Sequence, residues 1–110
     1  MIKNIKFLSN KHKSRFLGLF NVSINKNKAL LYILSSNLLY KKSEFLYDFR
    51  NNKIKKLEYY LSSSEQTFYD LFLSIYNNEK IDNTIIENSC LDEDNKEIAY
   101  IAINLNLEGK

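Results

Sequence analysis

Two side chains in this sequence could act as a nucleophile, a general base or a metal ligand, and each occurs once. His12 is the only histidine and Cys90 the only cysteine among the 110 residues. A catalytic Cys–His pair needs a third group that orients the histidine, and a zinc site needs four ligands at characteristic spacings. Neither pattern surrounds these positions. We therefore interpret His12 as an ordinary surface or boundary residue and Cys90 as a small buried hydrophobic residue.

Carboxylates are abundant, but they form no recognised catalytic or metal-binding motif. The run Asp92-Glu93-Asp94 fails the EF-hand pattern, because Lys96 stands at the fifth position of the loop and no glycine stands at the sixth. The run fits the first turn of a helix, where the positive end of the helix dipole favours carboxylates. The two glycines lie too far apart for a phosphate-binding loop. The sequence therefore predicts a protein that is not an enzyme and that uses no cofactor and no metal.

Binding chemistry is better represented, because cationic side chains are interleaved with tyrosines. Cations recur along residues 11–15, 41–42 and 50–56, and the last group is followed by Tyr59-Tyr60. Lysines supply charge for phosphates and aromatic faces stack on unpaired bases, so the pattern is typical of a nucleic-acid surface. The same lysines also fit the solvated faces of amphipathic helices. The candidate residues for binding a partner or nucleic acid are Lys11, Lys13, Arg15, Lys41, Lys42, Arg50, Lys53, Lys55, Lys56, Tyr59 and Tyr60.

Charge divides the chain lengthwise. Residues 1–60 carry 13 Lys and Arg against 3 acidic residues, a net of +10, and residues 61–110 carry 3 lysines against 10 acidic residues, a net of −7. This asymmetry points to a charged partner, or to pairing between copies of the chain through their complementary halves. The sequence pI of about 8.9 falls short of the value above about 9 that is expected of a dedicated nucleic-acid binder.

The composition favours one helical domain. A chain of 110 residues can bury one core, and 45% hydrophobic residues argue against intrinsic disorder. Proline is absent and glycine occurs twice, which leaves few of the sharp turns that sandwiches and barrels need. We expect a single all-α domain over residues 1–110, a compact bundle of five or six short helices. The lone cysteine and the lack of a long apolar segment predict a cytoplasmic protein with no signal peptide and no membrane partner.

Caps and apolar spacing locate these helices. Ser9 is a helix cap, and the run from Ser62 to Gln66 holds two overlapping capping boxes, Ser62 with Glu65 and Ser63 with Gln66. Residues 54–61 fit either a helical turn or a short extended piece. The expected helices span about residues 10–21, 30–34, 38–49, 64–76, 81–88 and 92–105. The expected core is Phe16, Phe20, Leu30, Leu34, Phe45, Phe68, Leu71, Phe72, Ile75, Ile98, Ile101 and Leu105.

A series of short motifs runs along nearly the whole chain. They are Phe7-Leu8-Ser9, His12, Arg15-Phe16-Leu17, the run from Ala29 to Ser35, Tyr47-Asp48-Phe49, Lys53-Ile54-Lys55, the run from Leu61 to Ser64, the run from Leu73 to Asn78, and Leu91-Asp92-Glu93. In this order they resemble a family of small uncharacterised proteins, a domain of unknown function, from phages, prophages and mobile elements of low-GC Gram-positive bacteria. The chain departs from that family at residues 55–60, where relatives have a proline and a longer loop.

The resemblance implies no catalytic residues and a role in binding, since small phage accessory proteins often act on a host enzyme or defence complex, as anti-CRISPR proteins do. We therefore expect a non-enzymatic accessory protein that binds a host protein complex and modulates or blocks it. Either the acidic half would mimic nucleic acid toward a basic groove, or the basic half would cover an acidic patch. The alternative is a small nucleic-acid-binding regulator that uses the basic amino-terminal half.

Overall fold

The predicted all-α class is confirmed by a computed structural model, which describes residues 5–109. Within that range six α-helices and one 3-10 helix, η1, are accompanied by a single two-stranded antiparallel sheet. The elements in chain order are α1 (Asn10–Val22), α2 (Lys28–Leu34), η1 (Tyr40–Lys42), α3 (Ser43–Leu46), β1 (Tyr47–Asp48), β2 (Lys53–Ile54), α4 (Ser63–Tyr76), α5 (Asn83–Glu87) and α6 (Glu93–Glu108).

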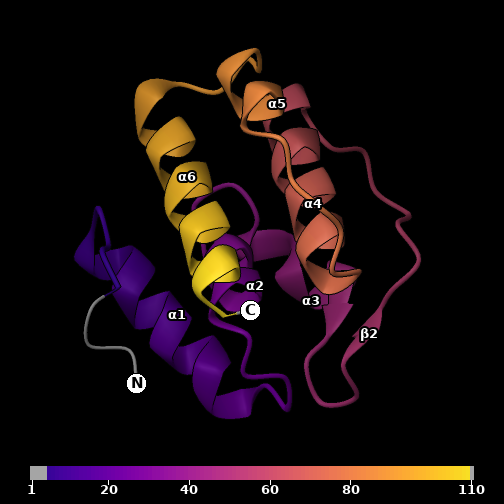
Figure 1. The fold of residues 1–110 in the computed structure, drawn as a ribbon. Coiled ribbons are helices and arrows are strands. Elements are labelled where there is room, and N and C mark those ends of the chain that lie inside the picture. The colour runs from indigo at the N-terminus through magenta and orange to yellow at the C-terminus, as the bar shows by residue number, and fades with distance from the viewer. Residues whose placement is uncertain (1–4, 110) are drawn as a thin grey trace.

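The short helix α2 forms the centre of the molecule, with α1, α4 and α6 around it (Figure 1). Every residue from Ala29 to Leu34 is at most 1% exposed, so α2 has no solvated face. Seven residues are too few for a helix that is stable on its own in water. Its stability therefore comes from burial of apolar surface against its three neighbours, of which α6 packs on it most extensively.

Each of the three long helices begins at a side-chain cap; those of α1 and α4 are expected from the sequence, whereas Asp92, expected in the first turn of the last helix, is the cap before it. Ser9 Oγ accepts the His12 N–H at the start of α1, and Asp92 accepts the Asn95 N–H at the start of α6. Ser62 and Glu65 form the expected capping box of α4. The second expected box, Ser63 with Gln66, is absent, because the Gln66 amide donates instead to the Asp70 carboxylate at 2.8 Å.

The helix expected over residues 38–49 is wrong in its second half. Helix α3 ends at Leu46, and the chain turns at Tyr47 into β1, which pairs with β2 in the register Tyr47 to Ile54. Asn52 closes the intervening turn with a φ of 55°, a left-handed conformation that asparagine tolerates. The Tyr47 ring packs edge-on against Phe72 of α4, at 5.6 Å between centroids. This long-range contact outweighs the local helical preference, and residues 55–61 follow without regular structure.

The shortened helix changes which residues are buried. Leu39, Ser43 and Leu46, at helical spacing, face the core, whereas Phe45 is 49% exposed and was wrongly assigned to it. The other expected core positions are buried or partly buried, with Phe20, Ile101 and Leu105 in the second group. The spacing of apolar residues therefore predicts most of the core correctly. The wrong prediction, Phe45, lies in the helix that stops earlier than expected.

His12 and Cys90 take the opposite environments to those expected. His12 is 4% exposed, its Nε2 lies 2.9 Å from the Tyr32 carbonyl oxygen, and its ring contacts the rings of Phe7 and Tyr32. It is buried because the segment before α1 folds back over it. Cys90 is exposed, because its neighbour Leu91 fills the buried position after α5.

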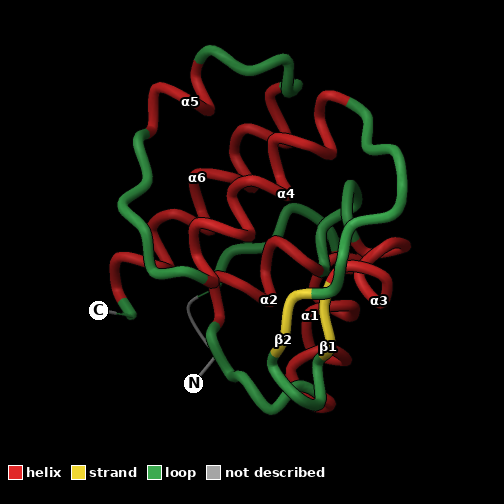
Figure 2. The backbone as a smooth tube through the Cα atoms, turned by 90° about the vertical axis from the view of Figure 1, so that its right-hand side faces the viewer, coloured by secondary structure: helices red, strands yellow, loops and turns green. Residues whose placement is uncertain are grey.

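The β1–β2 hairpin and α3 lie at the end of the molecule away from α5 (Figure 2). The described part of the chain measures 35 × 33 × 27 Å along its principal axes. None of the helices within residues 5–109 is long and apolar enough to cross a membrane.

Candidate binding surface

Exposed aromatic side chains and lysines gather where η1 and α3 lie beside the extended segment of residues 55–60. The rings of Phe45 and Tyr59 are 5.1 Å apart between centroids. Lys42 Nζ donates to the Tyr60 carbonyl oxygen at 3.4 Å, and Lys55 Nζ donates to the Glu44 carbonyl oxygen at 2.6 Å. We call this region the aromatic–basic surface and define it as Lys42, Phe45, Lys55, Lys56, Tyr59 and Tyr60.

Local backbone contacts explain why this segment runs beside α3. After β2 the Lys55 N–H donates to the Leu46 carbonyl oxygen at 3.0 Å, which holds the chain against the end of α3. Leu57 is partly buried against the core and Leu61 is 7% exposed, so both anchor the segment. Tyr59 and Tyr60 lie between these two anchors and remain outside the core.

The aromatic residues of the surface are unusually accessible. Phe45 is 49%, Tyr59 51% and Tyr60 88% exposed. Large exposed apolar side chains that gather in one place mark recognition sites, since exposing them to water lowers the stability gained on folding. Aromatic residues are also enriched at protein–protein interfaces.

The charges of the surface are mixed. Lys42 Nζ forms an ion pair with Glu65 Oε1 at 2.9 Å, which ties η1 to the start of α4. The hydrogen bond from the Ser62 N–H is the main cause that lowers the pKa of Glu65, and Lys42 adds to it, so this carboxylate stays ionised. Glu44 and Glu58 are exposed nearby in sequence. Three lysines thus share the region with three glutamates, which makes it a poor match for a purely anionic ligand.

The structure brings together some of the eleven candidate residues and leaves others apart. Lys42, Lys55, Lys56, Tyr59 and Tyr60 belong to the surface. Arg15 of α1 lies close to η1, at the edge of this surface: its guanidinium is 4.7 Å from the centre of the Tyr40 ring and donates to Asn37 Oδ1 at 3.0 Å. Lys41 is exposed in η1. No hydrogen bond or ion pair within residues 5–109 joins the remaining four side chains to the surface; these are Lys11 and Lys13 on α1, and Arg50 and Lys53 on the hairpin.

Two members of this neighbourhood escaped the sequence analysis. Phe45 was assigned to the core, and Tyr40 was not singled out at all. The available signal was the helical spacing of Leu39, Ser43 and Leu46, which places Phe45 on the opposite side. Leu39, Ser43 and Leu46 can be recognised as the buried face only when it is known that the helix stops at Leu46.

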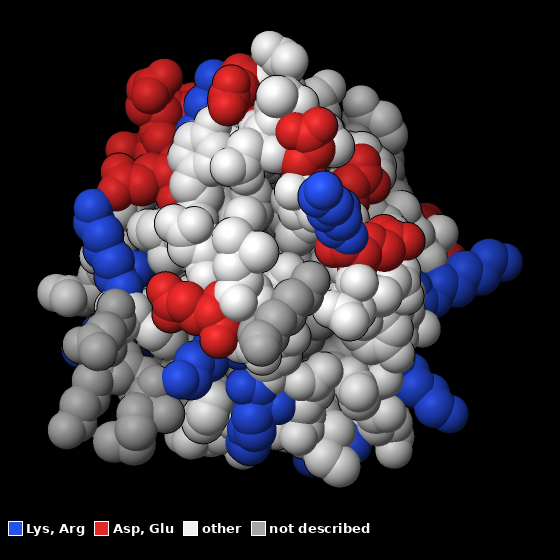
Figure 3. Space-filling model, viewed as in Figure 1, with Lys and Arg blue, Asp and Glu red and all other residues white. Residues whose placement is uncertain are grey.

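The lengthwise division of charge in the sequence is visible on the folded molecule. In the view of Figure 3, acidic side chains gather mainly on the upper part, where Figure 1 places α5 and the start of α6. Lysine and arginine side chains lie mainly along the lower part and the edges. On this face of the molecule, the charge asymmetry of the sequence is therefore also an asymmetry of the surface.

Within the described residues, no group of three or more His, Cys, Asp and Glu side chains is arranged to hold a metal ion. The structure also separates the two reactive side chains that the sequence contains once each. His12 is buried between α1 and α2, and Cys90 lies in the loop between α5 and α6 with its Sγ 3.7 Å from Ser64 Oγ.

No family model matches the chain, and no curated protein or solved structure matches it. The resemblance to phage and mobile-element proteins therefore stays a hypothesis, and the geometry of the chain itself is what bears on its function.

Proposed function

We propose that this chain is a non-enzymatic binding protein that engages a protein partner through the aromatic–basic surface and modulates or blocks that partner. The observation that carries the proposal is the grouping of exposed Phe45 on α3 with exposed Tyr59 and Tyr60 on the segment of residues 55–60, which is held against α3. Exposed aromatic anchors surrounded by polar and charged side chains are the usual composition of an interface hot spot.

The mixed charges favour a protein partner over a polyanion. Lys42 is engaged by Glu65, and Glu44 and Glu58 would repel a phosphate backbone that ran across the surface. A protein can place its own acidic and basic groups opposite this pattern, which contributes specificity more than affinity. The resemblance described above makes a host protein complex, including a defence nuclease, the partner class to test first.

A pull-down from a lysate of a low-GC Gram-positive host tests this proposal. The wild-type chain should retain a stoichiometric protein, and the double variant Phe45→Ser, Tyr59→Ser should lose it. The control is Ile85→Ser, which removes an apolar side chain of α5 that is 62% exposed and lies outside the aromatic–basic surface. Retention by all three proteins would reject the assigned surface, and the absence of any stoichiometric protein would count against a host partner.

Nucleic-acid binding is the second candidate, and the 88% exposure of Tyr60, four residues after Lys56 in the chain, favours it, because a free ring can stack on an unpaired base. Binding should weaken steeply with salt: the logarithm of the binding constant should fall linearly with the logarithm of the salt concentration, by about 0.7–0.9 per phosphate neutralised. The variant Lys53→Glu, Lys56→Glu should abolish a mobility shift, and it keeps Lys55, whose ammonium group holds the Glu44 carbonyl. A wild-type chain that shifts neither DNA nor RNA at low salt would remove this candidate.

A further inference from the structure

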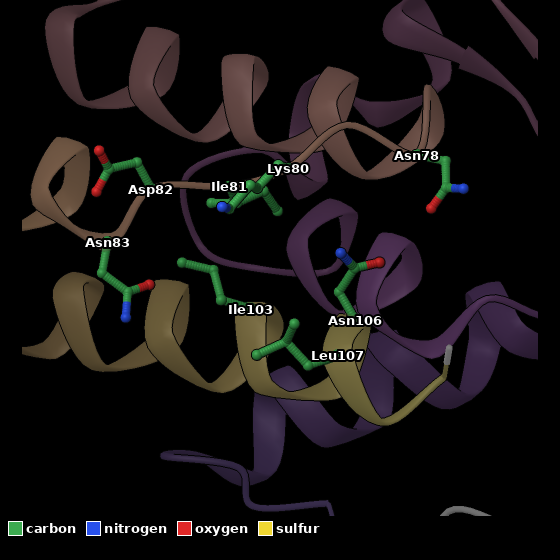
Figure 4. Close-up of a pocket in the computed structure, with 8 residues that line it drawn as sticks. All are labelled: Asn78, Lys80, Ile81, Asp82, Asn83, Ile103, Asn106 and Leu107. Atoms are coloured by element: carbon green, nitrogen blue, oxygen red, sulfur yellow. The ribbon is translucent and has the colours of Figure 1, made fainter.

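A cleft of about 880 Å³ opens between α6 and the chain that follows α4. One wall is the last part of α6, and the other is the segment from Asn78 to Asn83, which runs back along α6 (Figure 4). Its volume lies within the range of about 300–1,000 Å³ that ligand pockets occupy. Residues 81–83 belong to the helix expected over residues 81–88, but none of the lining residues was predicted as a binding residue, and the cleft shares none of them with the aromatic–basic surface.

The wall on α6 contains a polar residue at a position that packing alone would fill with an apolar one. Ile103, Asn106 and Leu107 lie on one face of the helix, with exposures of 4%, 7% and 63%. Asn106 continues the buried positions Ala99, Ala102 and Ile103, and Figure 4 shows its carboxamide directed toward the opposite wall. The Asn106 side chain forms no hydrogen bond within residues 5–109. Its nitrogen and oxygen are not among the fully buried, unpartnered side-chain atoms of the described residues, so they are open to the cleft, where a ligand can hydrogen-bond to them.

The opposite wall offers main-chain hydrogen-bonding groups. The segment is extended as it enters α5, with φ −97° and ψ 119° at Asp82. The main-chain N–H and C=O groups of Lys80 and Ile81 take part in no hydrogen bond within the described chain. The Asp82 carboxylate is already used, since it accepts the Thr84 N–H at the start of α5. An extended backbone with unpaired groups is the element to which another strand adds.

We propose that this cleft binds an extended peptide segment that carries aliphatic side chains between basic residues. Its main chain would pair with Lys80 and Ile81 and hydrogen-bond to the Asn106 carboxamide. Its aliphatic side chains would pack between Ile81 and the α6 residues Ile103 and Leu107. Basic flanking residues fit because Glu79 and Glu108 border the lining residues and the carboxyl-terminal half of the chain carries a net charge of −7.

The lining disfavours a nucleotide. Its apolar residues are aliphatic, whereas bases are usually held by stacking on aromatic rings. Lys80 is the one cation among the lining residues, and Asp82 lies close to it in the chain. A phosphate group would therefore meet as much negative as positive charge there.

Nuclear magnetic resonance with defined peptides tests the proposal. The probe is a pool of capped heptapeptides of the pattern lysine-threonine-X-threonine-X-threonine-lysine, in which X is valine, isoleucine or leucine. These peptides should shift the main-chain signals of Lys80 and Ile81 and the side-chain amide of Asn106. The same peptides with N-methylated amides at alternate residues should bind at least about tenfold more weakly, since they lose the main-chain bonds.

Substitutions give a second, independent readout. Asn106→Leu should lower the affinity for the peptides about tenfold while the protein unfolds at the same or a higher temperature, and Asn104→Leu, on the exposed side of α6, should bind like the wild type. If Asn106→Leu fails to fold, Leu107→Ser at the exposed rim replaces it and should also weaken binding. Adenosine monophosphate is the comparison ligand. No peptide-induced shift in the cleft, equal binding of the N-methylated peptides, or shifts with the nucleotide alone would each overturn the proposal.

Discussion

At the scale of single residues, His12 is held neutral by its surroundings. Burial is the main cause that lowers its pKa from the ordinary value of 6.5, and the positive charge of Arg15 lowers this pKa further. The hydrogen bond to the Tyr32 carbonyl raises the pKa but does not outweigh burial. Nδ1 of the ring is buried and has no hydrogen-bond partner. Protonation would place a cation among the rings of Phe7 and Tyr32, which cannot solvate it as water does.

This environment predicts a stability that depends on pH. Above pH 6.5 the histidine is neutral in both the folded and the unfolded chain and has no effect. As the pH falls below 6.5, the unfolded chain binds a proton that the folded chain does not, so the free energy of unfolding decreases, by at most about 1.4 kcal/mol per pH unit. Urea unfolding between pH 7 and 5 (a window set by the ordinary histidine pKa) measures this slope.

The matched variant for that measurement is His12→Phe. The Tyr32 carbonyl keeps a second donor, Ser35 Oγ at 3.1 Å, so the substitution leaves no unpaired acceptor there. His12→Phe should be nearly insensitive to pH in the same window. Carboxylates with lowered pKa, such as Glu65, lose their contribution only in more acidic solution. If the free energy of unfolding of the variant depended on pH as strongly as that of the wild type, groups other than His12 would cause the pH dependence.

Phe45 and Leu46 give a second prediction, because they are adjacent but lie in different environments. Leu46 is fully buried, so Leu46→Ala should lower the free energy of unfolding by about 2–5 kcal/mol. Phe45 is half exposed, so Phe45→Ser should cost less than about 1 kcal/mol. Thermal or urea unfolding of the two variants measures the difference. Similar losses would mean that Phe45 belongs to the core after all.

At the scale of elements, the sequence located the helices whose ends carry their own signals. Ser9 and Ser62 cap α1 and α4, and these local hydrogen bonds can be anticipated from residue types alone. The carboxylates of residues 92–94 indicate where α6 begins, although Asp92 is its cap and not part of its first turn. The early end of the helix expected over residues 38–49 could not be anticipated, because the burial of Tyr47 against α4 decides it. The cleft escaped for a similar reason, since its two walls come from parts of the chain separated by α5.

The capping box of α4 predicts a difference between two neighbouring serines. Ser62→Ala removes the hydroxyl that accepts the Glu65 N–H and should lower the free energy of unfolding by about 1 kcal/mol. Ser63→Ala should have little effect, because the box expected between Ser63 and Gln66 does not form. Chemical denaturation of both variants is the test, and equal losses would contradict the observed cap.

At the scale of the whole molecule, the separation of charge predicts weak association between copies. Opposite halves of two chains attract each other, and salt screens this attraction as the Debye length shrinks from about 10 Å at 0.1 M to about 3 Å at 1 M. Sedimentation velocity should therefore show a larger average mass at low salt than at high salt. A mass that does not change with salt would show that the two charged sides do not recognise each other.

The complete burial of α2 has a consequence for the chain during its synthesis. The residues from Ala29 to Leu34 leave the ribosome early, but α6, which covers them most extensively, is made last. Until α6 is made, the apolar residues from Ala29 to Leu34 are only partly buried. Exposed apolar stretches of incomplete chains aggregate or recruit chaperones. A nascent chain that stalls before α6 would therefore be a substrate for cellular quality control, although its α1, α2 and α4 sequences are complete.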